Sequence, residues 1–575
     1  MENGLLSQES SLFSLGGAGI KPSFSDGECD YSVIEDARTK MTRRILTALS
    51  ATLALMLCIE TAAFAGEPEG HSKIPEAWED QNRVFYEIFT GSFSDSDGDG
   101  IGDLQGIIRR MDYLNDGNTQ SGDSLGIGGI WLTPVFSSPS YHKYDVTDYG
   151  TVDPTFGTEA DLQELIRACH ERDVKLILDL PLNHTGREHA WFQDFLNAHR
   201  EGDTGSRWYD FYSWMKPEDA IPSGRRFIPL EDLLVEANFS DDMPELNFDN
   251  PDVREEVLRI GKHYLEMGVD GFRFDAAKYL YLGEPEKNIA FWKWYMDGLR
   301  EIRPDVYAVA EVWDGDSTVN PYAASVNCFR FSTSQAEGLI AKTAKGGNVN
   351  RLTQNTEEYW QTLHEINPDA IHIPFLSNHD MDRAAGYLPN KGGKMAMAAN
   401  LYLLTPGSPF IYYGEEIGLR GSRGSAMTDA NRRLHMPWGD DDPVSDPEGS
   451  DYASQTTETV QSQLEKQGSL FRHYQRVLRV RKENPEIAAG TYTALHFEDT
   501  KLGGFLCTWQ GKTAGVFHNP TGSPLTVDLS SVTDIRLQTI AAVLGTADEG
   551  FAELSGTELT LGGMTSAVLR AEEGD

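Results

Sequence analysis

Four separate apolar segments in the middle of the chain each end in ionisable side chains. The segments are Asp179-Leu-Pro-Leu-Asn-His184, Gly271-Phe-Arg-Phe-Asp275, Ala310-Glu-Val-Trp313 and Ser377-Asn-His-Asp380. Because side chains alternate along a strand, Arg273 and Asp275 point to the same side. Carboxyl groups held close together cannot all ionise cheaply, so one of them should carry a proton. A protonated acid beside an ionised carboxylate is the pair that cleavage of a glycosidic bond needs.

The same residues also have a purely structural interpretation. Taken alone, Arg273 and Asp275 would serve equally well as a buried ion pair that supports the fold. Polar groups at the ends of four segments are more than one supporting pair requires, so we favour a catalytic site.

From about Asn82 to Leu419, apolar segments of strand length alternate with helical patterns. Eight strands are expected near residues 83–89, 128–135, 174–182, 269–276, 305–312, 326–331, 371–377 and 408–413. Near-continuous apolar strands separated by helices indicate a buried parallel sheet. Eight repeats predict an α/β fold, the closed (β/α)8 TIM barrel, whose active site lies at the carboxyl ends of the strands. An open doubly wound sheet is the alternative. It would require a Gly-rich, phosphate-binding turn after the first strand, and the sequence has none there.

Two helices carry clear boundary signals. Thr158, with Asp161 three positions later, can cap free backbone N–H groups. Asn250-Pro251 places Pro in the first turn of a second helix, and Gly268 ends that helix before the next strand.

These patterns divide the chain into four parts. Residues 1–65 form an N-terminal extension with a signal peptide, 66–184 and 250–485 the barrel, 185–249 an inserted subdomain B, and 486–575 a C-terminal antiparallel β-sandwich. The insertion follows the third strand and is too long for a simple loop. In the last part, turn residues such as Leu502-Gly-Gly504 separate short strands, and no helical period remains.

The amino-terminal part predicts export. Met41-Thr-Arg-Arg44 is basic, residues 45–59 are apolar, and Ala63-Phe-Ala65 supplies small residues for cleavage after Ala65. We expect a secreted protein, extracellular or periplasmic, without stable membrane association after cleavage. An uncleaved anchor is the alternative, although the apolar run is short for a membrane span. Cleavage would leave Cys169, Cys328 and Cys507, which allow one disulfide at most.

The charge of the chain limits its partners. Lys and Arg total 49 and Asp and Glu total 89, so the formal net charge is −40. Nucleic acid is excluded as a partner because phosphate binding needs a cationic surface. A neutral substrate and a bound cation both fit this charge.

An acidic loop follows the first strand. Oxygen ligands stand at positions 1, 3, 5, 7 and 9 of a calcium-loop pattern: Asp95, Asp97, Asp99, the carbonyl of Ile101, and Asp103. Position 12 is Gly106 instead of Glu, so the loop is not a complete EF-hand. A solvated acidic turn is the other interpretation.

Together, the four polar segments resemble the four sequence regions of the alpha-amylase family, glycoside hydrolase family 13. They occur in the order of that family, and the resemblance runs from about Asn82 to the carboxyl end. It implies a retaining double displacement. Asp275 would be the nucleophile and Glu311 the acid/base, while Asp380 would bind sugar hydroxyls and stabilise the distorted transition state.

The resemblance also implies contacts to the substrate. Arg273 would hold Asp275 ionised, and His184 and His379 would donate hydrogen bonds to the sugar before the cleaved bond. Tyr144 matches the Tyr that stacks on this sugar. A separate match is Lys278, the first residue of an amylase-type Lys-His pair in the leaving-group subsite, where this chain has Tyr279 in place of His.

The acidic loop resembles the calcium site of many family members, which implies Ca²⁺ as a cofactor. A second calcium position of the family, between the barrel and subdomain B, would use Asn183 and the carbonyl of Tyr279. Ala276, after the nucleophile, leans toward α-1,4 links, and Met243-Pro-Glu-Leu-Asn247 resembles the extra motif of members intermediate toward oligo-1,6-glucosidases and neopullulanases.

The sequence therefore predicts a secreted, monomeric alpha-amylase that cleaves internal α-1,4 bonds of an α-glucan polysaccharide or oligosaccharide. The alternatives within the class are an exo-acting α-glucosidase, a cyclomaltodextrinase or neopullulanase-type enzyme, and a transglycosylase. A non-catalytic carbohydrate-binding or transporter-assembly subunit is the alternative from another class. The presence of all three carboxylates argues against that alternative.

Overall fold

The computed structural model describes residues 80, 82–118, 122–389, 393–424, 427–453, 455–456, 458–546 and 550–571. The predicted extension and signal peptide, residues 1–65, lie outside the described residues. Ile74–Asp575 forms one compact unit, so the boundaries predicted within it stay predictions. In the described ranges, no helix has both the length and the apolar composition needed to cross a membrane.

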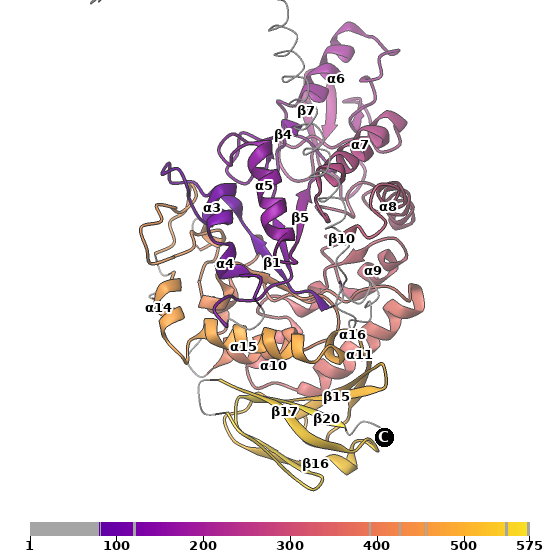
Figure 1. Ribbon diagram of the computed structural model, residues 1–575. Helices are drawn as coiled ribbons and strands as arrows, with labels where there is room; N and C mark the ends of the chain where they lie inside the picture. The colour runs from indigo at the N-terminus through magenta and orange to yellow at the C-terminus, as the bar shows by residue number, and fades with distance from the viewer. Residues whose placement is uncertain are drawn as a thin grey trace, which may run out of the picture. The chain divides into compact units, whose positions relative to one another are not determined.

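Seven parallel strands form the sheet at the centre of this unit (Figure 1). In spatial order they are β11 (Asn327–Cys328), β10 (Tyr307–Ala310), β9 (Gly271–Phe274), β5 (Lys175–Leu180), β2 (Gly129–Leu132), β1 (Phe85–Ile88) and β12 (Phe410–Tyr412). Parallel bridges from Phe329 to Ile373 and from Phe375 to Phe410 connect the two edge strands and close the sheet. The predicted (β/α)8 barrel is confirmed.

Only those two bridges form where a strand was predicted near 371–377, so the prediction of a regular strand there was wrong. Pro374 lies between the bridges and has no N–H to donate to a ladder. The position still belongs to the barrel, because Arg330 N donates to the carbonyl of Ile373 (3.0 Å) and Phe410 N donates to that of Pro374 (3.1 Å).

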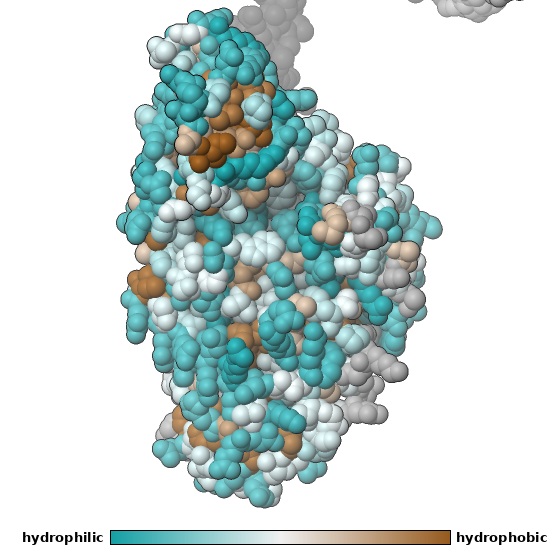
Figure 2. Space-filling view, turned by 180° about the vertical axis from the view of Figure 1, so that it is seen from behind, coloured by the Kyte–Doolittle hydropathy of each residue, from teal (hydrophilic) through white to brown (hydrophobic). Residues whose placement is uncertain are grey.

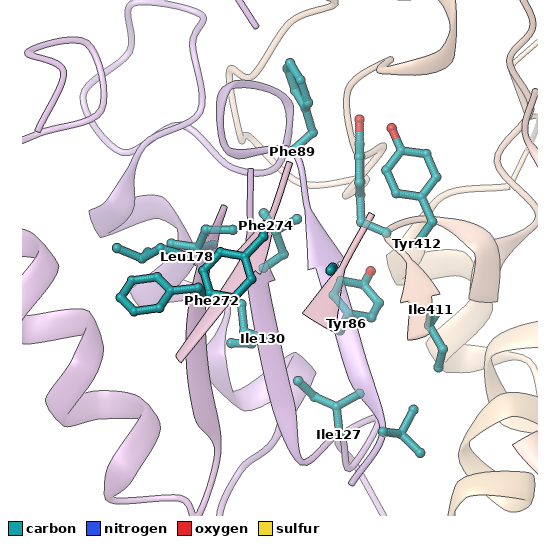
Figure 3. Packing of buried hydrophobic residues seen from close by; sticks show 14 of the residues in the cluster. Tyr86, Phe89, Ile127, Ile130, Leu178, Phe272, Phe274, Ile411 and Tyr412 are labelled. Carbon is teal, nitrogen blue, oxygen red and sulfur yellow. The ribbon is translucent and has the colours of Figure 1, made fainter. Parts of the chain in front are cut away.

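The barrel strands are apolar on both faces. Outward-facing side chains such as Tyr86, Leu178 and Phe272 pack in the layer between the strands and the helices (Figure 3). Inward-facing side chains fill the barrel: Phe85, Trp131, Ile177, Tyr307, Val309 and Phe410. Burial of both faces explains why these strands appear in the sequence as near-continuous apolar runs.

The predicted helix boundaries are confirmed. Thr158 Oγ1 accepts the N–H of Asp161, whose carboxylate accepts the N–H of Thr158. Asn250 caps the second helix, which ends at Gly268 with a φ of 115°. The longer helices are α5 (Glu159–His170), α7 (Pro251–Met267), α8 (Pro285–Arg300), α11 (Val349–Ile366), α13 (Lys394–Leu403) and α15 (Leu470–Glu483). The shorter ones are α3 (Leu104–Arg109), α4 (Met111–Leu114), α9 (Asp316–Val319), α10 (Leu339–Ala344), α12 (Ala384–Tyr387), α14 (Val460–Glu465) and α16 (Glu486–Ala489).

The segment after β5 builds a small layer at one end of the molecule, at the top of Figure 1. It contains α6 (Ala190–Glu201) and an antiparallel sheet of β6 (Trp214–Met215), β8 (Leu233–Glu236) and β7 (Phe227–Leu230). Before it, β3 (Phe136–Ser137) pairs with β4 (Asp148–Val152).

Two antiparallel sheets follow the barrel at the opposite end of the molecule, as predicted (Figure 1). The larger contains β13 (Thr491–Leu495), β14 (Gly503–Trp509), β15 (Lys512–Asn519), β20 (Thr565–Ala571) and β17 (Leu537–Gly545). The smaller contains β16 (Leu525–Asp528), β19 (Glu558–Leu561) and β18 (Ala552–Ser555). The amides of Asn350 in α11 and Asn400 in α13 donate to the carbonyls of Phe497 (2.7 Å) and Leu544 (3.0 Å), which ties these sheets to the barrel.

Cys169, Cys328 and Cys507 are all buried and free. The face in Figure 2 is mainly hydrophilic, which fits a chain with 24% charged residues. Hydrophobic residues on this face gather chiefly at the end that carries the inserted segment.

Candidate active site

The inward-facing side chains become polar at the carboxyl ends of the strands. Glu87 follows Phe85 on the inner face of β1, and Asp179 follows Ile177 on that of β5. On β9, Arg273 lies in register with Asp179, and Glu311 comes directly after β10. Every second side chain of a strand points into the barrel. The alternation that packs apolar side chains there therefore also directs these polar groups toward one another.

Arg273 is the centre of this cluster and is completely buried. Its Nη1 donates to both oxygens of Asp179 (2.9 and 3.0 Å) and to Asp275 Oδ1 (2.6 Å). Its Nη2 lies 3.1 Å from Glu311 Oε2. One guanidinium thus contacts three carboxylates, those of Asp179, Asp275 and Glu311, and holds them close together.

Glu311 has the electrostatic surroundings of an acid. Burial raises its pKa to about 7, Asp275 and Asp380 act in the same direction, and Arg273 opposes them. The N–H of Ala276 donates to Oε2 (3.0 Å) and fixes the carboxyl group. Burial also raises the pKa of Asp275, while the ion pair with Arg273 lowers it.

Asp380 has the opposite surroundings. Burial alone would raise its pKa, but His379 and Arg433 hold that pKa well below the usual range. His379 Nε2 lies 3.0 Å from Oδ2, and Arg433 Nη2 donates to Oδ1 (2.7 Å). Asp380 is therefore ionised at a pH at which Glu311 keeps its proton.

His379 is held by Glu87, a residue outside the four polar segments. Its Nδ1 lies 2.6 Å from Oε1 of the buried Glu87, which also accepts the backbone N–H of His379 (3.2 Å). Burial alone would lower the pKa of His379, but Asp380 and Glu87 raise it to about 10. The imidazole is thus a cation at neutral pH, with both ring nitrogens as donors.

Tyr144 and His184 line the pocket that also contains Asp275, Glu311 and Asp380. The hydroxyl of Tyr144 donates to Asp179 Oδ2 (2.8 Å) and lies 2.7 Å from His379 Nε2. Burial lowers the pKa of His184 to about 4, so its ring is neutral. His184 is buried where it lines the pocket, so its predicted hydrogen bond to a sugar stays a prediction.

Lys278 lies at the edge of the site. Its Nζ donates to the carbonyl of Trp313 (2.7 Å) and to Asp314 Oδ2 (3.1 Å). It is not among the residues that line the main pocket, so its predicted contact with substrate stays a prediction.

The cluster opens into a pocket of about 620 Å³. Its rim carries three exposed apolar side chains, Phe239, Trp313 and Met427, which are 46%, 38% and 65% exposed. In the sequence, Trp313 stands out only as part of a motif, and Arg433 lies in the Arg432-Arg-Leu-His-Met-Pro-Trp438 segment, outside the four polar segments. A signal for Glu87 existed, because a Glu inside an apolar strand is rarely buried without a partner.

A family model described as the alpha-amylase catalytic domain matches residues 87–490, more than half of the chain. The chain belongs to the alpha-amylase family. It is thus a member of a family of glycoside hydrolases, as the four segments predicted.

Members of the alpha-amylase family are similar to this chain over most of its length. "Alpha-amylase 3" of Dictyoglomus thermophilum is 36% identical over 459 residues, which cover 76% of this chain and 85% of that protein. A "4-alpha-glucanotransferase" of Thermotoga neapolitana is 31% identical and covers 76% of this chain and 95% of its own length. The solved structure of Eubacterium rectale Amy13B has a TM-score of 0.78 at 32% identity and covers 86% of this chain and 96% of that one.

The acidic loop of this family member brings three of its predicted ligands together. Carboxylate oxygens of Asp95, Asp97 and Asp99 lie within 4.8 Å of one another. Asp103 instead caps α3, accepting the N–H groups of Gly106 (2.7 Å) and Ser96 (2.7 Å). Three convergent carboxylates suit a hard cation such as Ca²⁺, which prefers oxygen ligands.

The second predicted calcium position contains a buried acidic pair. Asn183 O accepts the N–H of Leu246 (3.0 Å), which places Asn183 beside Glu245. Burial and the neighbouring Glu236 raise the pKa of Glu245 to about 8. Asn183 as a metal ligand stays a prediction.

Proposed function

We propose that this enzyme is a secreted, retaining hydrolase of α-glucans that cleaves internal α-1,4 bonds. The observation that carries the proposal is the contact of one buried guanidinium, that of Arg273, with both Asp275 and Glu311. Retaining glycosidases hold their two carboxyl groups about 5–5.5 Å apart, whereas inverting ones leave room for a water between them. Two carboxylates bound to the same guanidinium favour the shorter spacing.

In the first step, an oxygen of Asp275 bonds to the anomeric carbon of the sugar. Glu311 gives its proton to the glycosidic oxygen as the bond between that oxygen and the anomeric carbon breaks. Asp380 binds hydroxyls of the sugar whose ring becomes positively charged, and the cationic His379, whose ring nitrogens contact Glu87, Asp380 and Tyr144, holds Asp380 in place. A pKa of about 7 suits Glu311 to this role near neutral pH.

In the second step, Glu311 is a carboxylate and takes a proton from an incoming water. The water oxygen bonds to the anomeric carbon, the ester bond to Asp275 breaks, and both carboxyl groups return to their starting states. The anomeric configuration is inverted twice and therefore retained.

Internal cleavage is supported by the rim of the pocket. Phe239, Trp313 and Met427 come from three different segments and offer apolar contacts beyond the reacting sugar. Flat apolar sugar faces pack on such side chains, so the rim favours a glucan chain longer than the reacting sugar. The relative named alpha-amylase is consistent with hydrolysis.

Transfer to a second sugar is the other candidate function. The relative named 4-alpha-glucanotransferase favours it. Both reactions share the ester intermediate and differ only in the acceptor that attacks it.

Three further elements belong to the proposal. Residues 1–65 direct export, with cleavage near Ala65. The loop of Asp95, Asp97 and Asp99 binds Ca²⁺ as a structural ion, and the enzyme acts as a monomer. The structural role of the ion is favoured because the loop carries none of the residues proposed for catalysis.

The product profile of the purified protein on soluble starch tests this function, with Glu311→Gln as the control. We expect iodine staining to fall quickly while mixed short maltooligosaccharides appear in the α configuration. Glucose or maltose alone, with slow loss of staining, would indicate an exo-acting enzyme. Products in the β configuration would contradict the retaining mechanism, and an active Glu311→Gln variant would contradict the role of Glu311.

A further inference from the structure

Glu87 is a buried carboxylate in the middle of an apolar strand. It is only 1% exposed, and its neighbours in β1, Tyr86 and Ile88, belong to the hydrophobic core. Glu side chains are almost never fully buried unless they are paired. Glu87 is not among the residues that line the active-site pocket. Its charge therefore requires an explanation other than contact with the substrate.

Hydrogen bonding alone does not require that charge. Glu87 Oε1 accepts two N–H groups of His379, that of the backbone (3.2 Å) and that of Nδ1 (2.6 Å). The side-chain oxygen of a Gln could accept from the same two donors. A Gln could not, however, stabilise a positive charge on the imidazole ring. The charge of Glu87 therefore points to the protonation state of His379.

His379 lies between two carboxylates. Its Nδ1 faces Glu87, and its Nε2 lies 3.0 Å from Asp380 Oδ2. A neutral imidazole carries a single N–H, so one of the two carboxylates would then face the lone pair of a ring nitrogen. The cation donates to both carboxylates and removes this repulsion.

The rest of the environment opposes a cation. His379 is completely buried, and the ring of Trp131 lies edge-on to it with the centroids 5.7 Å apart. Burial alone would lower the pKa of His379, whereas Asp380 and Glu87 raise it to about 10. If one of these two carboxylates lost its charge, burial would lower this pKa toward neutral pH.

The other charged groups around His379 take part in the proposed reaction. The carboxylates that act on its ring are those of Glu87 in β1, Asp179 in β5, Asp275 after β9, and Asp380. Arg273 binds Asp179 and Asp275. Arg433 binds Asp380 and the carbonyl of His379, and the hydroxyl of Tyr144 lies 2.7 Å from Nε2. The positive charge of His379 in turn lowers the pKa of Asp275 and Asp380.

We propose that Glu87 is a positioning residue for catalysis, which keeps His379 cationic and thereby holds Asp380 in the orientation and charge state that the reacting sugar requires. The proposal rests on the proposed function, because it is there that Asp380 binds the sugar. Glu87 acts only through His379, and no proton leaves this pair during the reaction.

Two substitutions separate the charge of Glu87 from its hydrogen bonds. Glu87→Gln keeps the acceptor oxygen and removes the charge, and Glu87→Asp keeps the charge on a shorter side chain. The substrate is α-maltosyl fluoride, because its fluoride leaving group depends less on the proton of Glu311. The ratio of kcat/KM of the unsubstituted enzyme to that of each variant is measured from about pH 5.5 to 9.5.

For Glu87→Gln, we expect this ratio to rise about 10-fold across the pH range, because His379 of the variant loses its proton and a charged hydrogen bond to Asp380. Glu87→Asp should give a smaller rise, since it still carries a negative charge. A ratio that is the same at every pH would show that Glu87 only supports the fold, and would overturn the proposal.

A second measurement does not depend on activity. Nitrogen-15 NMR of the full chain with labelled histidine distinguishes a charged imidazole from a neutral one. At about pH 8.5, the unsubstituted protein should give a charged-imidazole signal that a His379→Gln variant lacks, and Glu87→Gln should shift this signal toward the neutral form. A signal that Glu87→Gln leaves unchanged would contradict the proposal.

The two measurements also separate this proposal from the proposed function. If the unsubstituted protein did not cleave α-maltosyl fluoride, the proposed function would fail, while the NMR signal would still report the charge that Glu87 gives to His379. Melting temperatures of all variants verify that each one is folded.

Discussion

At the scale of single residues, neighbours a few ångströms apart give Glu311 and Asp380 opposite protonation states. Burial and nearby carboxylates raise the pKa of Glu311 to about 7. His379 and Arg433 lower that of Asp380, although burial opposes them. Glu311 can therefore donate a proton while Asp380 remains an anion beside it, able to stabilise positive charge on the sugar ring.

The pH dependence of catalysis follows from Glu311. We expect kcat/KM on maltoheptaose to fall tenfold per pH unit above about pH 7, because the acid then loses the proton that it must donate. The measurement is a pH profile of initial rates. With α-maltosyl fluoride, whose leaving group needs less protonation, this alkaline limb should be weaker. A rate on maltoheptaose that stayed constant to pH 9 would contradict the assignment.

The ion pair of His379 with Glu87 should appear in the pH dependence of stability. The pKa of His379 is about 10 in the folded protein, against about 6.5 for an unperturbed His. A raised folded pKa gives stability that is fully present below pH 6.5 and lost as pH rises toward 10. Glu87→Gln removes one of the carboxylates that raise this pKa. The free energy of unfolding of the variant, from urea titrations, should therefore fall less between pH 6.5 and 9.5. Parallel pH slopes for the two proteins would contradict this coupling.

At the scale of elements, local signals determine the helix ends. In α5, Thr158 and Asp161 form a reciprocal pair of hydrogen bonds at the first turn. We expect Thr158→Ala to lower the free energy of unfolding by about 1 kcal/mol, because a helix N–H then loses its partner. Urea denaturation measures the change. Thr204→Ala, at an exposed loop position, is the matched control and should change stability by less than about 0.5 kcal/mol.

These local signals also explain how much of the fold could be predicted from the sequence. Apolar runs located seven strands, and the caps at Thr158 and Asn250 located two helix starts, because each pattern depends on nearby residues. The prediction of a regular strand near 371–377 was wrong because Pro374, which has no backbone N–H to donate, interrupts an otherwise apolar run.

The site was only partly predictable, for a related reason. Asp275, Glu311 and Asp380 stand in recognisable segments at strand ends. Glu87 contacts His379 from 292 positions away, and Arg433 reaches Asp380 from 53 positions away. Closure of the barrel creates such contacts, and spacing along the chain does not encode them.

At the scale of the whole molecule, the acidic loop joins distant parts of a chain whose net charge is −40. The N–H of Asp95 donates to Asp442 Oδ1 (3.1 Å), and the carbonyl of Gly100 accepts from Ser445 N (2.9 Å) and Oγ (2.8 Å). The loop after the first strand thus anchors the segment around residues 440–446. Three carboxylates within 4.8 Å would repel one another without a cation and weaken this connection.

Removal of the Ca²⁺ proposed for this loop should therefore lower thermal stability. An ion that binds only the folded state stabilises it by about 2.7 kcal/mol when its free concentration is 100 times its Kd. We expect chelation to lower the Tm by several degrees, added Ca²⁺ to restore it, and Mg²⁺ to restore less. Asp97→Asn should lower the Tm in calcium and make it insensitive to chelator, because the cation loses a ligand and the neighbouring carboxylates repel less. Elemental analysis measures the metal content. A Tm that did not change when the metal was removed would exclude a stabilising role for this loop.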